Sequence, residues 1–143
     1  MTSNEERARQ VDRFIQDIFG DRPGQMIEEV DADESVIAVR VTARNLLDEI
    51  VITKLSQAFA KLADGSLNVK YLVVDLSGVS HLSSSALGML FSLHKKLQNK
   101  GGSLALTNIP GTIREVMIIT HIDTIIPIFD STQAAMRHFT AMA

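Results

Sequence analysis

Residues 71–90, YLVVDLSGVSHLSSSALGML, decide the fold, because a short apolar run leads through a polar loop into a segment of helical periodicity. The run at 71–75 is rich in β-formers, which is typical of a strand covered on both faces. After three consecutive serines, one apolar stripe continues at helical spacing until Gly101 and Gly102 end it. The stripe consists of Leu87, Leu90, Phe91, His94 and Leu97. The stretch therefore predicts a buried strand, a loop and a helix.

Strand and helix patterns continue on both sides of this stretch. Further strands are predicted at 26–30, 36–42, 104–106 and 124–129, the first two as a hairpin. Further helices are predicted at 48–63, with Asp48 as a helix starter, from the capping box Thr112-x-x-Glu115, and from Ser131. The side chains expected to face the core are Ile113, Val116 and Met117 on the short helix and Ala135, Phe139 and Met142 on the last one. Pro127 cannot donate a ladder hydrogen bond, so it is expected at a sheet edge or at the end of a strand. The order predicts one α/β domain with a mixed, mostly parallel sheet of about five strands and packed helices.

The N-terminal segment predicts an additional amphipathic helix at 3–19. It begins with a capping box, Ser3-x-x-Glu6, and Gly20 and a turn at 21–24 end it. The apolar stripe consists of Val11, Phe14, Ile15, Ile18 and Phe19. We expect this stripe to pack on its own domain, and a homodimer or a partner surface is the alternative. The chain is accordingly divided into a helical extension, 1–24, and a domain, 25–143.

Composition excludes several classes of function. The 143 residues are 45% hydrophobic, enough for one core, and no apolar run approaches the roughly 18 to 20 residues that cross a bilayer. The charged start, MTSNEERARQ, has no signal-peptide pattern, so a cytoplasmic protein without direct membrane contact is expected. A net charge of −3 and the absence of Trp argue against a nucleic-acid partner.

The motifs of common enzymes and cofactor sites are not found. With no Cys, and with histidines at 81, 94, 121 and 138 that lack ligand spacing, we predict no metal site. Phosphate-binding loops and the GxSxG elbow are also absent, so no cofactor and no enzymatic activity are expected. A small hydrolase that uses Ser85 with a histidine is kept as a rival hypothesis. His94, on the apolar stripe, is interpreted as a hydrogen-bonded core histidine.

The serine run belongs to a longer motif. Helix capping explains one of Ser83, Ser84 and Ser85, and the small Ala86 and Gly88 would let another protein approach the first turn. Residues 73–88, the long helix after them, KGGSLAL at 100–106 and the short helix that follows resemble the STAS domain of anti-sigma factor antagonists. The resemblance covers about residues 26 to 140 and implies a STAS-like fold.

The resemblance also implies a phosphorylation switch. In that family an anti-sigma factor serine kinase, which carries ATP, phosphorylates the serine before the small-Leu-Gly triplet, and a PP2C-type phosphatase restores it. Carried over, the acceptor is Ser85. Members often have Asp at the position of Ser83 and Gly at that of Ala86, which makes Ser84 the alternative acceptor. The partner-binding residues are then predicted to be Ser83, Ser84, Ala86, Gly88, Asp75 and His81.

Two points stay open at this stage. Asp75 either holds the loop by accepting backbone N–H bonds or is a strand-end residue with no such role. The second functional hypothesis is a scaffold module of a stress-sensing assembly or of a lipid or anion transport complex. The additional N-terminal helix motivates it.

Overall fold

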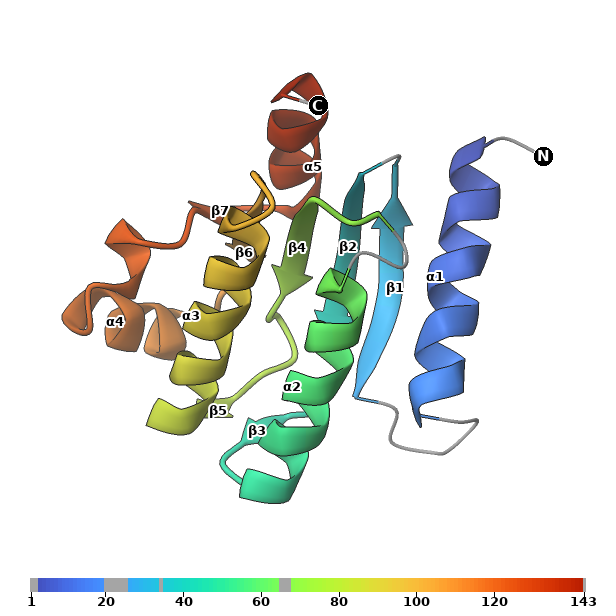
Figure 1. Ribbon diagram of the computed structural model, residues 1–143. Helices are drawn as coiled ribbons and strands as arrows, with labels where there is room; N and C mark the ends of the chain where they lie inside the picture. The colour runs from blue at the N-terminus through green and yellow to red at the C-terminus, as the bar shows by residue number, and fades with distance from the viewer. Residues whose placement is uncertain (1–2, 20–25, 34, 65–67, 143) are drawn as a thin grey trace.

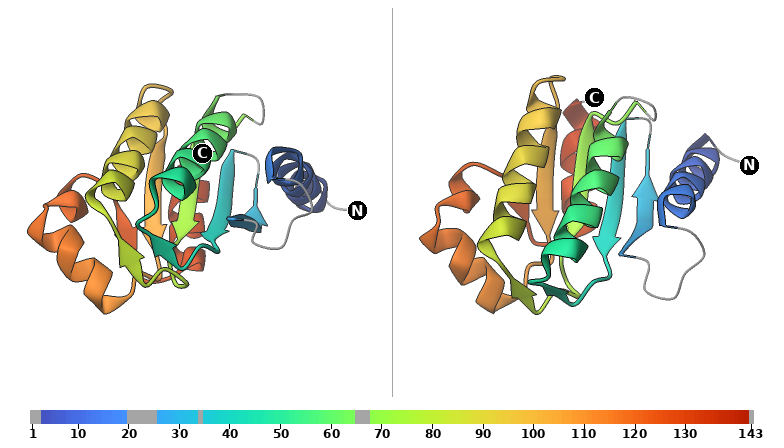
Figure 2. Two further views of the ribbon diagram at one scale, coloured as in Figure 1. Left: turned by 90° about the horizontal axis from the view of Figure 1, so that it is seen from below. Right: turned by 60° about the horizontal axis from the view of Figure 1, so that its bottom comes forward.

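A computed structural model describes residues 3–19, 26–33, 35–64 and 68–142. Its helices are α1 (Ser3–Phe19), α2 (Glu49–Ala63), α3 (Ser84–Gln98), α4 (Gly111–Ile119), the 3₁₀ turn η1 (Ile122–Thr124) and α5 (Thr132–Met142). Its strands are β1 (Ile27–Ala32), β2 (Val36–Val41), β3 (Asn45–Leu46), β4 (Tyr71–Asp75), β5 (His81–Leu82), β6 (Ser103–Thr107) and β7 (Ile128–Phe129). Helices α2 and α3 cover one face of the main sheet, and α5 covers the other (Figures 1 and 2).

The main sheet has the predicted mixed topology. Its strand order is β1-β2-β4-β6-β7, in which only the β1–β2 hairpin is antiparallel. Strand β4 lies in the middle and all five of its residues are buried, as the apolar run predicted. β7 lies at an edge, as Pro127 indicated. Because parallel strands β2, β4 and β6 end on the same side, the helices that follow them begin together (Figure 1).

Two apolar clusters separate the sheet from its helices. The larger one lies between the sheet and α1 to α4, and includes Leu72, Leu90 and Phe59. The smaller one lies under α5, where the rings of Tyr71 and Phe139 stack with centroids 4.7 Å apart. Burial of these side chains on both faces of β4 supplies the main stabilisation of the fold.

Helix α1 packs beside strand β1 (Figure 2). Val11 and Ile15 are fully buried in the larger cluster together with Ile27, which confirms packing on the chain's own domain at these positions. They therefore belong to this core and are not available to a second copy. The predicted stop at Gly20, the turn at 21–24 and the side chains of Ser3, Ile18 and Phe19 lie outside the described residues.

Two local predictions were wrong. The capping box at Thr112 does not start α4, because the helix begins at Gly111 after Pro110, whose fixed φ suits a helix entry. The strand predicted at 124–129 is a strand only at 128–129. Its first residue, Thr124, belongs to η1, where Ile122 is buried and Thr124 Oγ1 donates to the carbonyl of His121 over 2.7 Å. Local hydrogen bonds of this kind compete with an extended conformation.

Two apolar residues predicted to face the core lie at the surface. Val116 is 38% exposed, whereas its neighbours Ile113 and Met117 on α4 are buried as expected. Met142 is 58% exposed because the last turn of α5 extends past the sheet (Figure 1). Ala135 and Phe139, on the earlier turns, are buried.

His94 is a core histidine, as its place on the stripe predicted. It is 2% exposed, and its Nδ1 accepts a hydrogen bond from the backbone N–H of Leu104 over 3.2 Å. Burial lowers the pKa of the imidazole, and the nearby backbone of Ile125 opposes this shift in part. Protonation would place a second donor against the Leu104 N–H, so the folded state keeps the ring neutral.

His94 is expected to make the domain acid-sensitive. Because the pKa of His94 is lower in the folded than in the unfolded state, its contribution to stability is present above the unfolded value of about 6.5 and is lost as pH falls. Urea unfolding at about pH 7.5 and 5.5 should show a smaller loss for His94→Asn than for wild type. His121→Asn, at an exposed histidine with φ of +61°, is the matched control and should behave as wild type. An unchanged pH dependence in His94→Asn would refute this assignment.

Candidate functional site

The three serines have different roles at the start of α3. Ser83 is the N-cap residue, in an extended conformation, and its Oγ accepts a hydrogen bond from the N–H of Ala86 over 3.2 Å. Ser84 and Ser85 are the first two helical residues, and both are exposed. Capping therefore uses one serine and leaves the hydroxyls of the other two at the surface.

A small two-stranded sheet holds this loop in position. β3 and β5 pair in parallel, Asn45 with His81 and Leu46 with Leu82. The N–H of Ser83 donates to the carbonyl of Leu46 over 2.9 Å, and His81 Nδ1 lies 2.8 Å from Asn45 Oδ1. Neither strand was predicted from the sequence, since two residues are too few for a periodic pattern. This pairing brings the first turns of α2 and α3 side by side (Figure 1).

Ser85 is hydrogen-bonded to a residue that sequence reasoning missed. Its Oγ donates to Glu49 Oε1 over 2.9 Å. Glu49 is the first residue of α2, which Asp48 caps by accepting from the N–H of Ile50 over 2.8 Å, as predicted for a helix starter. The only signal in the sequence was an acidic residue in a first helical turn, which the helix dipole explains equally well.

Asp75 supports the loop from within. It is 3% exposed, and its Oδ1 accepts from the N–H of Ser77 over 2.8 Å. Its Oδ2 accepts from Asn108 Nδ2 over 3.1 Å and lies 3.4 Å from Arg40 Nε. Of the two interpretations left open, the structure supports the one in which Asp75 holds the loop that precedes the serines.

Ala86 and Gly88 differ in their surroundings. Ala86 is fully buried, so it contributes to the core below the first turn. Gly88 is exposed inside α3, and a Cβ placed on it would meet no atom within 4 Å. A glycine within a helix costs about 1 kcal/mol relative to alanine. Among the described residues no contact at Gly88 offsets that cost, and the helix surface next to Ser84 and Ser85 is left uncovered.

Exposed apolar side chains flank the site. Leu47 is 53% and Ile50 68% exposed, and they lie next to Asp48 and Glu49 at the start of α2. A second exposed group lies on α4 and after η1, and consists of Val116, Ile118, Ile119 and Ile125. Neighbouring apolar side chains at a surface are a feature of protein interaction sites.

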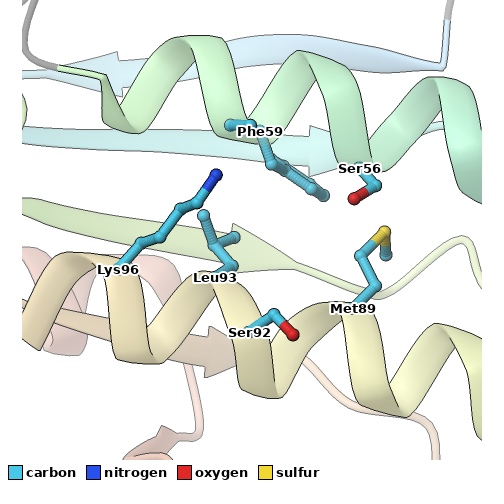
Figure 3. A pocket seen from close by; sticks show the side chains of 7 residues that line it. Ser56, Phe59, Met89, Ser92, Leu93 and Lys96 are labelled. Carbon is cyan, nitrogen blue, oxygen red and sulfur yellow. The ribbon is translucent and has the colours of Figure 1, made fainter.

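The cavity between α2 and α3 is too small for a metabolite. Its volume is about 40 Å³, whereas sites for small molecules occupy about 300 Å³ or more. Figure 3 shows Ser56, Phe59, Met89, Ser92, Leu93 and Lys96 around it.

Within the described ranges, no three His, Asp or Glu side chains are grouped so as to hold a metal ion. No helix in the described part of the chain has the length and apolar character needed to span a membrane.

Comparison with known proteins identifies the family. The family model described as the STAS domain matches residues 24–135. The chain belongs to the STAS domain family. The match includes the serine run and the glycine at 88, and helix α1 lies outside it.

Several solved structures share this fold at low sequence identity. An anti-sigma factor antagonist from Mycobacterium paratuberculosis is 24% identical, with a TM-score of 0.65 over 78% of this chain and 92% of that one. The Bacillus cell fate determinant SpoIIAA, in its phosphorylated form, is 16% identical, with a TM-score of 0.63 over 79% and 98% of the two chains. The murine anion transporter Slc26a9 is 18% identical, with a TM-score of 0.63 over 78% of this chain and 19% of the transporter.

Proposed function

We propose that this STAS domain is a non-enzymatic, cytoplasmic anti-sigma factor antagonist. When unphosphorylated it binds an anti-sigma factor serine kinase, and phosphorylation of Ser85 releases it. Ser84 is the alternative acceptor. The observation that carries the proposal is the exposed Ser85 hydroxyl in the first turn of α3, which capping does not use, beside an exposed Gly88 that no part of the described chain covers. A PP2C-type phosphatase restores the unmodified protein.

The proposed partner-binding surface follows the exposed residues of the loop and first turn. Ser84, Ser85, Gly88 and His81 present their surfaces to solvent. Behind this surface, Ser83 caps α3, Asp75 holds the loop and Ala86 packs in the core. Leu47 and Ile50 extend the surface with apolar area, which suits the buried centre of an interface.

The chemical step needs ATP, which the kinase carries. The Ser85 Oγ forms a bond to the γ-phosphorus, the bond from that phosphorus to the bridging oxygen of ADP breaks, and a base of the kinase takes the hydroxyl proton. In the reverse step the phosphatase directs water onto the phosphorus, and inorganic phosphate leaves with the hydroxyl restored. The product carries about −1.5 to −2 charges at a helix N-terminus, where backbone N–H groups favour anions.

The proposal is tested by Ser85→Ala with the serine kinase and labelled ATP. Because alanine has no hydroxyl to accept the phosphate, incorporation should fall to background, while binding to the kinase should stay within about threefold of wild type. Ser84→Ala is the matched control and should still accept phosphate. Incorporation that persists in Ser85→Ala and disappears in Ser84→Ala would move the acceptor to Ser84, and incorporation that persists in both would refute the site.

A STAS module that docks constitutively in a larger assembly is the second candidate. The exposed apolar group on α4, with Ile118 52% and Ile119 76% exposed, favours it. The structural similarity to about a fifth of the murine anion transporter Slc26a9 agrees with it. Co-purification with membrane transport subunits, or a large particle by light scattering, would favour this candidate over the switch.

A further inference from the structure

The hydroxyl of Ser85 is hydrogen-bonded to a carboxylate on another helix. Its Oγ donates to Glu49 Oε1 over 2.9 Å, and this bond joins the first turns of α3 and α2. Both side chains are exposed. A serine in a first helical turn would otherwise be surrounded by backbone N–H groups and water, which favour an anion. Here a carboxylate already lies at hydrogen-bond distance from the oxygen that would carry the phosphate.

The backbone around Glu49 is held in place. Asp48 caps α2 through the N–H of Ile50, and the β3–β5 pairing joins the two loops that lead into α2 and α3. The bond from the Ser83 N–H to the Leu46 carbonyl adds a further link. Since both helices start from one small sheet, Glu49 can move away from Ser85 only by turning its side chain or by displacing the first turn of α2.

A phosphate on Ser85 would turn the attraction between Ser85 and Glu49 into a repulsion. The esterified Oγ has no proton, so it cannot donate to Glu49. The phosphate has a second pKa of about 6 and is mostly dianionic at neutral pH. Like charges at such a distance repel, and the carboxylate therefore disfavours the dianionic form of the phosphate.

We propose that Glu49 is the positioning residue of the switch. It holds the Ser85 hydroxyl in the unmodified protein, and the phosphate drives it away in the modified protein, together with the first turn of α2. This inference rests on the phosphorylation of Ser85 proposed above and adds a consequence inside the molecule. The displaced turn lies next to Leu47 and carries Ile50, which are 53% and 68% exposed. Phosphorylation therefore changes the shape of the apolar surface as well as the charge beside it.

The second pKa of a phosphate at position 85 measures its contact with Glu49. Phosphoserine can be introduced at position 85 during synthesis, so the test needs no kinase, and a ³¹P NMR titration gives its second pKa. We expect this pKa to be higher with Glu49 than in Glu49→Gln by about 0.5 unit or more, because the carboxylate disfavours the dianion. Phosphoserine at position 84 is the matched control, and there the same substitution should have a smaller effect. Equal pKa values at position 85 in both backgrounds would overturn the inference.

Backbone amide exchange tests the movement of α2. Phosphate at position 85 should accelerate exchange at residues 47–50 with Glu49 and leave it nearly unchanged in Glu49→Gln. A static contact would give a pKa difference with no change at these amides, and that result would overturn the displacement. The Ser85→Ala experiment judges phosphorylation by the kinase separately, so a failure here is distinguishable from a failure of the proposed function.

Discussion

Phosphorylation of Ser85 is expected to weaken binding to the kinase by more than a hundredfold. An interface that fits a neutral hydroxyl must desolvate the phosphate and face it with groups of unsuitable charge, at a cost of several kcal/mol. A loss of 3 kcal/mol alone exceeds a factor of one hundred, since about 1.4 kcal/mol corresponds to tenfold. Titration calorimetry of the kinase with the unmodified and the phosphorylated protein measures the difference.

The structure offers a control for charge on the same helix. Ser92 is exposed two turns further along α3, so Ser92→Asp adds a negative charge away from the first turn. Its effect on affinity should stay within about threefold, because charges separated by about a Debye length are largely screened. The helix content of the phosphorylated protein should be retained, as an anion at a helix N-terminus is tolerated. Equal affinities of the unmodified and the phosphorylated protein would rule out release by phosphate.

Replacement of Gly102 by alanine is expected to be the most damaging single change to the fold. A Cβ at Gly102 would lie 1.6 Å from the carbonyl oxygen of Lys70, which is backbone and cannot turn aside. The adjacent Ser103 N–H donates to that same oxygen over 3.2 Å, at the point where β4 and β6 begin to pair. The two strands would have to separate at this end, so we expect a loss of at least about 3 kcal/mol in the free energy of unfolding.

Gly88→Ala is the matched control for this prediction. A Cβ at Gly88 meets nothing within 4 Å, and alanine is the better helix former. This variant should gain about 1 kcal/mol, measured by the same urea titration. If Gly88 contacts the kinase as proposed, the more stable variant should bind it less tightly. A Gly102→Ala variant as stable as wild type would show that the strands adjust without cost.

Local patterns in the sequence were sufficient for most of the fold. The apolar run of β4, the stripe of α3 and the helix starter Asp48 depend on neighbours within a few residues. Helix capping acts over that range and apolar periodicity repeats within it, which explains why these elements were predicted correctly. The strand predicted at 124–129 was wrong at 124–127, because the apolar composition suits a strand while a side-chain hydrogen bond of Thr124 stabilises a 3₁₀ turn.

The sequence by itself determined that one of three serines would cap a helix and that the others would be surplus. Only the tertiary structure decided that Ser83 is the cap, that Asp75 is buried behind the loop, and that Ser85 donates to Glu49. Glu49 and Ser85 are 36 residues apart, and no periodic pattern connects them. They meet because β3 pairs in parallel with β5 and brings the starts of two helices together. Such pairing joins segments that are far apart in the sequence, so it forms only when the intervening chain has folded.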